Sequence, residues 1–178
     1  MVAVSDGTAS DVVLRLAGGG ESVTRYLRGL GVTGMVVATS EAEMARGDDV
    51  QYRNWATPLA AIQLLRAIQE GPGLSPSSRD LLQEFMFASV PGARRIPGLL
   101  PAGTRIAHKT GTSGTQDGLT RATNDVGIVR LPDARHLAVA VFVSDSRADE
   151  ATRAAVIARI ARAAWDRWQA ASIEKAAW

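Results

Sequence analysis

The sequence contains no cysteine, and this absence excludes disulfide bonds, thiolate nucleophiles and zinc sites built from cysteine. Proteins without cysteine occur in oxidising and reducing compartments alike, so the composition leaves the compartment open. The sequence has only two histidines, His108 and His136, and neither lies near a carboxylate pair at ligand spacing. We therefore expect no metal site.

Long apolar runs are also missing from the sequence. No run is long enough to span a bilayer, and the first residues lack the charged and apolar regions of a secretory signal. We therefore expect no membrane span. The first four residues lead almost at once into a polar turn, so we expect the sequence to begin inside a longer protein.

Lysine is scarce, because only two of the 20 lysine and arginine residues are lysines. The arginines are scattered along the chain and the formal net charge is only +2, which argues against nucleic-acid binding. Against this background, Lys109 in the string His108-Lys109-Thr110-Gly111-Thr112 indicates a position that favours a compact ammonium over a planar guanidinium.

The apolar content, 46% of 178 residues, is sufficient for a buried core. Residues 1–102 are predicted to be mainly helical, and Thr57-Pro58 and Ser75-Pro76 are typical helix starts. The second of these helices carries apolar side chains at positions 81, 82, 85 and 86, which predict a buried stripe. Residues 39–54 are polar and acidic without a period, which predicts a long surface loop.

Residues 103–178 are predicted to form antiparallel strands followed by a C-terminal helix. The β-prone runs are residues 104–110, 125–131 and 136–143, and the turn at 132–135 predicts that the last two pair as a hairpin. Residues 137–143 are apolar on both faces and therefore need cover on both sides, which an amphipathic helix over 150–170 supplies in part. The predicted fold class is α/β (α+β), an antiparallel sheet flanked by helices in one unit.

Three short motifs occur in order: Ser5-Asp6-Gly7, Glu41 in the acidic loop, and Lys109-Thr110-Gly111-Thr112 at a strand end. Each alone has an ordinary explanation, namely a helix cap, a solvated loop carboxylate and a strand entering a turn. Together they resemble the motifs of class A serine β-lactamases. The strings at residues 50–58, 107–115 and 122–127 extend this resemblance, which is strongest to the PER-type and VEB-type branch.

The resemblance implies a β-lactamase/transpeptidase-like fold, a β-lactam substrate, no cofactor, and a periplasmic or secreted location. It implies that Ser5 relays a proton to the lactam nitrogen, Lys109 attracts the substrate carboxylate, and Glu41 activates the water that releases the acyl group. The residues it assigns to substrate binding are Gly7, Thr110, Gly111, Thr112 and Ser113.

The sequence departs from the family pattern in several places. The nucleophile motif S-x-x-K occurs only as Ser172-Ile173-Glu174-Lys175, after the other motifs and beyond the predicted helix, and we interpret it as chance. We therefore expect a C-terminal portion that is incomplete at its N-terminus, lacks the nucleophile and is inactive alone. In addition, Gly7 and Ala45 replace asparagines, and Thr39 replaces an arginine.

Two alternatives remain open from the sequence. One is a relative of the penicillin-binding peptidases or esterases, and Glu41 is the feature that argues against it. The other is a noncatalytic fragment that acts only by docking on the missing N-terminal segment.

Overall fold

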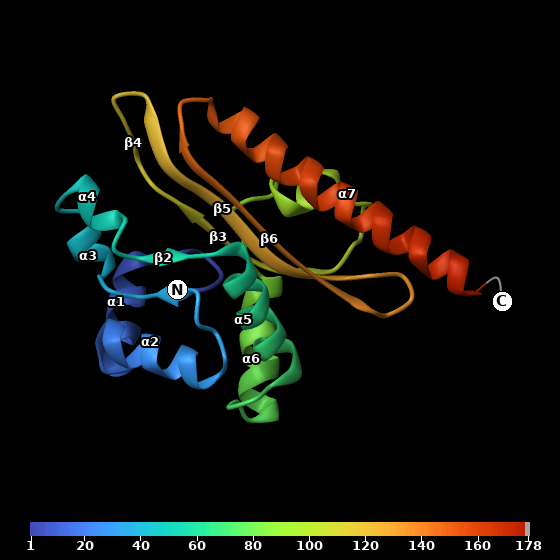
Figure 1. Ribbon diagram of the computed structural model, residues 1–178, viewed down its shortest axis with the longest axis horizontal. Coiled ribbons are helices and arrows are strands. Elements are labelled where there is room, and N and C mark those ends of the chain that lie inside the picture. The colour runs from blue at the N-terminus through green and yellow to red at the C-terminus, as the bar shows by residue number, and fades with distance from the viewer. Residues whose placement is uncertain (177–178) are drawn as a thin grey trace.

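An antiparallel sheet from the second half of the chain separates two layers of helices in the computed structural model, which describes residues 1–176 (Figure 1). The central strand β5 pairs with β3 on one side and with β6 on the other, and the short strand β4 extends the β3 to β5 connection. The strands are β3 (Ile106–Thr112), β4 (Thr115–Gln116), β5 (Leu119–Arg130) and β6 (His136–Ser146). The predicted hairpin at 132–135 is confirmed, since Leu131 N–H donates to the Arg135 carbonyl at 2.8 Å.

One face of the sheet is covered by the long helix α7 (Glu150–Ala176) and the short 3-10 helix η1 (Ile96–Leu99). Ile96, Ile157 and Trp165 pack there against the inward side chains of β5 and β6. Alternate residues of a strand point to opposite faces, which explains why every second residue of β6 joins this cluster.

The opposite face is covered by α5 (Pro58–Glu70) and α6 (Pro76–Phe87). Leu65 and Met86 of these helices pack against Ala107 and Ile128 of the sheet. The prediction that residues 137–143 are covered on both sides is therefore confirmed, because α7 and α5 both contact β6.

Two helices and a two-stranded ribbon make up the first part of the chain. Helix α1 (Gly7–Leu16) begins where the Asp6 carboxylate accepts a hydrogen bond from Ala9 N–H, at 2.7 Å. The remaining elements are α2 (Gly19–Gly29), β1 (Met35–Val36) and β2 (Trp55–Ala56). The ribbon β1–β2 brings together the two ends of the segment between these strands, so residues 39–54 begin and end at the same place on the protein. We call this paired base of the segment its neck.

The predicted loop at 39–54 is partly helical, which corrects the sequence-based expectation. It contains α3 (Glu41–Met44) and α4 (Asp48–Gln51), and Ser40 and Glu43 form a reciprocal capping box at the start of α3. Helices of one turn are too short to show an apolar period, so the pattern could not reveal them.

Two further expectations are wrong. Helix α7 continues to Ala176, so Ser172 lies within the helix and not beyond it. The predicted stripe on α6 is buried only in part: Met86 is buried, but Leu81 and Phe85 are 49% and 46% exposed. None of the helices in the described part of the chain is long and apolar enough to cross a membrane.

The core beneath α7 allows a stability test with an internal control. Ile157 is fully buried, whereas Ile160 on the same helix is 47% exposed. We expect Ile157→Ala to lower the free energy of unfolding by about 3 kcal/mol, since it leaves a cavity, and Ile160→Ala to lower it by less than about 1 kcal/mol. Urea denaturation followed by circular dichroism measures both, and equal losses would contradict the packing described here.

Candidate active site

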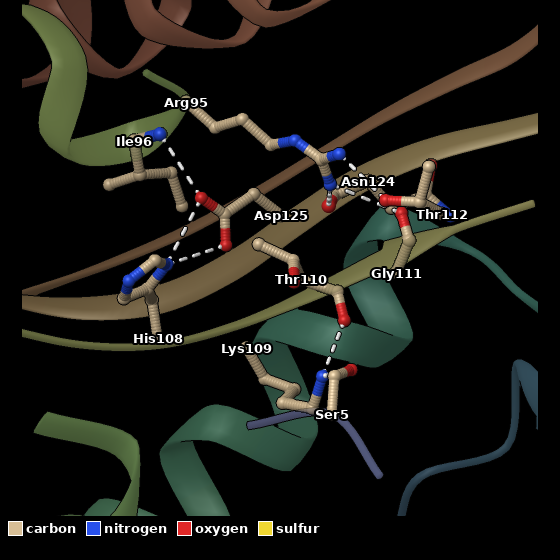
Figure 2. A network of polar contacts seen from close by, with 10 residues as sticks. All are labelled: Ser5, Arg95, Ile96, His108, Lys109, Thr110, Gly111, Thr112, Asn124 and Asp125. Carbon is tan, nitrogen blue, oxygen red and sulfur yellow. Dashed lines mark hydrogen bonds and ion pairs between the residues drawn. The ribbon is translucent and has the colours of Figure 1, made fainter. Parts of the chain in front are cut away.

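The ammonium of Lys109 meets the hydroxyl of Ser5 at the centre of the site (Figure 2). Ala107 packs toward α5 and α6, so strand alternation places Lys109 on that same face. Lys109 Nζ donates to Ser5 Oγ at 2.5 Å and to the Thr110 carbonyl at 2.8 Å. Ser5 adopts a left-handed φ of 58°, unusual for a serine, in the turn that leads into α1. Two predicted site residues that lie 104 positions apart are thus in direct contact.

The environment of Lys109 lowers its pKa below the ordinary lysine value. Burial is the main cause, and the positive charge of Arg95 acts in the same direction. The negative charges of Asp125 and Glu41 oppose this effect and raise the pKa. Among the described residues neither carboxylate forms an ion pair with the ammonium, so both act on Lys109 through their charge alone.

Glu41 lies beside Gly7 at the first turn of α3. Its main-chain N–H donates to the Asp11 carboxylate at 2.7 Å, and the next N–H, from Ala42, donates to the same carboxylate at 2.9 Å. A Cβ atom built on Gly7 would lie 3.4 Å from Glu41 Cγ, which is ordinary van der Waals contact. Helix α1 therefore carries Gly7 and also fixes the segment that presents the exposed Glu41 carboxylate.

Arg95 is a site residue that the sequence analysis missed. Its guanidinium is buried and donates from Nη2 to Thr112 Oγ1 at 2.6 Å and from Nη1 to the Asn124 carbonyl at 2.7 Å. A longer contact of 3.3 Å joins Nη1 to the Gly111 carbonyl. Nothing in the sequence distinguished Arg95, because it lies in an irregular connection of a chain rich in arginine.

The other predicted residues of β3 differ in their surroundings. Thr110 is buried, and its methyl group lies so close to Gly92 that a Cβ there would be 2.4 Å away, so this position needs glycine. Gly92 also has a φ of 90°, which glycine adopts without strain. Ser113, just after β3, uses its hydroxyl within the hairpin: it accepts from Ala122 N–H and donates to the Gly114 carbonyl, both at 3.0 Å.

The neck of the segment 39–54 is held by the side chain of Asn54. Its Oδ1 accepts from the N–H groups of Ala38 and Thr39 at 2.7 and 2.9 Å, and its Nδ2 donates to the Thr39 carbonyl at 2.9 Å. A neutral amide with both donor and acceptor atoms satisfies three main-chain groups here. The neck is thus closed by a neutral side chain.

The Ser5 hydroxyl contacts the Lys109 ammonium of β3, the Arg95 guanidinium contacts Thr112 of the same strand, and the charge of Glu41 acts on Lys109. The described residues match known proteins over almost their whole length. A model described as the beta-lactamase enzyme family matches residues 1–168. The chain belongs to this family. Among curated relatives, the extended-spectrum beta-lactamase PER-1 of Pseudomonas aeruginosa is 43% identical over 92% of this chain, and beta-lactamase VEB-1 of the same organism is 36% identical over 93%.

Solved structures agree with this family membership. A beta-lactamase from Chitinophaga pinensis DSM 2588 is 50% identical, with a TM-score of 0.89 over 92% of this chain and 60% of its own. The TLA-3 extended-spectrum beta-lactamase is 41% identical, with a TM-score of 0.90 over 92% of this chain and 60% of its own. The expected fold and the resemblance to class A enzymes are confirmed. The chain spans about half the length of the curated relatives it matches, 53% of PER-1 and 56% of VEB-1.

The neck formed by Asn54 can be tested by limited proteolysis. We expect Asn54→Ala to speed trypsin cleavage after Arg46 and Arg53 roughly tenfold, because three main-chain groups lose their partner and the segment opens more often. Gln51→Ala, in the same segment but outside the neck, is the matched control. Equal cleavage rates in the two variants would show that Asn54 does not hold the segment closed.

Proposed function

We propose that this chain supplies the proton relay, the carboxylate-binding residues and the water-activating base of a class A β-lactamase. The observation that carries this proposal is the contact between Lys109 Nζ and Ser5 Oγ, with Glu41 beside Gly7 at the same site. The acylating serine would lie on a segment outside these 178 residues. The substrate is a β-lactam, and the protein acts in the periplasm or is secreted.

The Lys109 contact explains how Ser5 would protonate the departing lactam nitrogen. Because the ammonium donates to Ser5 Oγ, the hydroxyl accepts through a lone pair and keeps its own proton available to donate. The positive charge also makes that proton more acidic. An amide leaves readily only when its nitrogen is protonated, so this arrangement serves the ring-opening step.

Arg95 would prepare Thr112 to bind the substrate carboxylate in a similar way. The guanidinium donates to Thr112 Oγ1, which leaves the hydroxyl proton of Thr112 free to donate to an anion. The resemblance assigns Thr110 to the same carboxylate and the Thr112 N–H to the oxyanion hole. Lys109 and Arg95 together give this end of β3 the positive charge that a carboxylate requires.

Glu41 would activate the water that hydrolyses the acyl-enzyme. Its side chain is exposed, and its main chain is fixed by Asp11, so the carboxylate is accessible to water at a defined position. The replacement of asparagine by Gly7 removes a side-chain amide beside this carboxylate and leaves room there.

The partner segment would also complete the sheet. Within the described residues, β6 pairs with β5 on one edge only, so its other edge can accept a strand. This edge supports assembly with a segment that carries the acylating serine, whether the segment is joined to the chain or separate.

A chimera tests the proposed activity. The residues of PER-1 that precede its matched region would be placed before this chain, so that an S-x-x-K serine is supplied. We expect the chimera to hydrolyse a chromogenic cephalosporin, and Lys109→Ala to reduce the rate roughly 100-fold, because the substrate carboxylate and Ser5 both lose their cation. A folded chimera with no more activity than its Lys109→Ala variant would refute the proposal.

Acyl-enzyme accumulation distinguishes a β-lactamase from a penicillin-binding peptidase. In the same chimera, we expect Glu41→Gln to form the acyl-enzyme and to release it at least about 100-fold more slowly, because the base is lost. Intact-protein mass spectrometry after mixing with a penicillin detects the covalent adduct. Glu43→Gln is the control, since Glu43 caps α3 in the same segment. Unchanged release in Glu41→Gln would exclude Glu41 as the base.

A further inference from the structure

Among the buried polar residues of the described chain, Asp125 is the one with a carboxyl group. Its side chain lies on β5 and is fully buried. Its Oδ1 accepts from His108 Nδ1 at 3.0 Å, and its Oδ2 accepts from Ile96 N–H at 3.1 Å (Figure 2). An ionised carboxylate can only accept, so Nδ1 of His108 carries a proton in this pair. The His108 ring is itself buried, with 4% of its surface exposed.

The two partners of Asp125 are the chain neighbours of the two cations at the site. Ile96 directly follows Arg95, and His108 directly precedes Lys109. The Asp125 carboxylate thus accepts one hydrogen bond from the main chain of Ile96, next to Arg95, and another from the side chain of His108, next to Lys109. Strand alternation places Lys109 on the opposite face of the sheet from His108, so Asp125 holds this position without contacting the ammonium.

The charge of Asp125 also favours the protonated forms of both cations. It raises the pKa of Lys109 and that of Arg95, against the lowering that burial causes in each. The other charges that act on Lys109 are Glu41 from α3, which raises its pKa, and Arg95, which lowers it. Asp125 is the buried carboxylate that acts on both cations.

We propose that Asp125 is a positioning residue that, through Ile96 and His108, fixes Arg95 and Lys109 at the carboxylate-binding end of β3, with its negative charge acting on the Lys109 ammonium. This assignment rests on the proposed function in one respect, namely that the two cations bind a substrate carboxylate. If Asp125 acted only in folding, its role would be to pair His108 and the Ile96 N–H. Replacement of Asp125 by asparagine would then leave the charge state of Lys109 unchanged.

The scarcity of lysine makes the charge state of Lys109 directly measurable. The sequence contains two lysines, Lys109 and Lys175, so lysine labelled with 13C at Cε gives two signals, and Lys175→Arg leaves Lys109 alone. The pKa of Lys109 is then read from an NMR titration of the 178-residue chain. We expect Asp125→Asn to lower this pKa. The control is Asp166→Asn, because Asp166 is an exposed partner of Arg162 on α7, and it should leave the Lys109 pKa unchanged.

Asp125→Ser provides a second variant if Asp125→Asn does not fold, because serine is smaller and also uncharged. An unchanged Lys109 pKa in either folded variant would overturn the proposal. Loss of folding in both variants would assign Asp125 a purely structural role and would overturn it as well. A lowered pKa in a variant that melts as cooperatively as the parent supports it.

The chimera adds a kinetic measurement. We expect Asp125→Asn to raise KM for a carboxylate-bearing β-lactam roughly tenfold with a smaller change in kcat, since ground-state binding of the carboxylate weakens. The loss of binding should begin at lower pH than in the parent, because a lower Lys109 pKa means that the ammonium is deprotonated earlier as pH rises. An equal fall in kcat and unchanged KM would contradict the assignment. If the chimera is inactive but the NMR shift occurs, the proposed function fails while the effect of Asp125 on Lys109 stands.

Discussion

The hydrogen bond from Lys109 to Ser5 is the point on which the arrangement of the site depends. It joins the turn before the first helix to a strand of the main sheet, across 104 positions of sequence. Ser5 has a left-handed φ that costs conformational energy, and a charged hydrogen bond is strong enough to offset such a cost. The position of Glu41 then depends on that of α1, because Asp11 of this helix accepts hydrogen bonds from the first main-chain N–H groups of α3.

The sheet divides the positive charge of the site between its two faces. Lys109 approaches from the side of α5 and α6, whereas Arg95 approaches from the side of η1 and α7, and both reach the end of β3. The lowered pKa of Lys109 reflects burial and the repulsion from Arg95, whereas the lowered pKa of Arg95 reflects burial and the charge of Arg153. A strand between Lys109 and Arg95 keeps the charges apart while their donor groups remain close to one binding position.

Much of this architecture could be predicted from sequence. Proline and glycine signals located α5 and α6, and two β-prone runs flanking the turn at 132–135 located the β5–β6 hairpin, because these signals are local. The triplet Ser5, Glu41 and Lys109 could be found only because three weak motifs occurred together. Arg95 and Asp125 could not be found, since their roles depend on contacts across 17 to 29 positions, which leave no period in the sequence. The short helices α3 and α4 escaped detection for a related reason, as one helical turn has no repeat.

The groups beside Glu41 add little charge to the site. The Asn54 amide closes the neck of residues 39–54 with neutral atoms. The field at Lys109 is then set by few groups: Glu41 on the solvent side and Asp125 and Arg95 on the buried side. Gly7 acts in the same direction, because it adds no polar side chain next to the Glu41 carboxylate. Among these three charges, that of Asp125 acts most strongly on Lys109 and raises its pKa, against the lowering that burial causes.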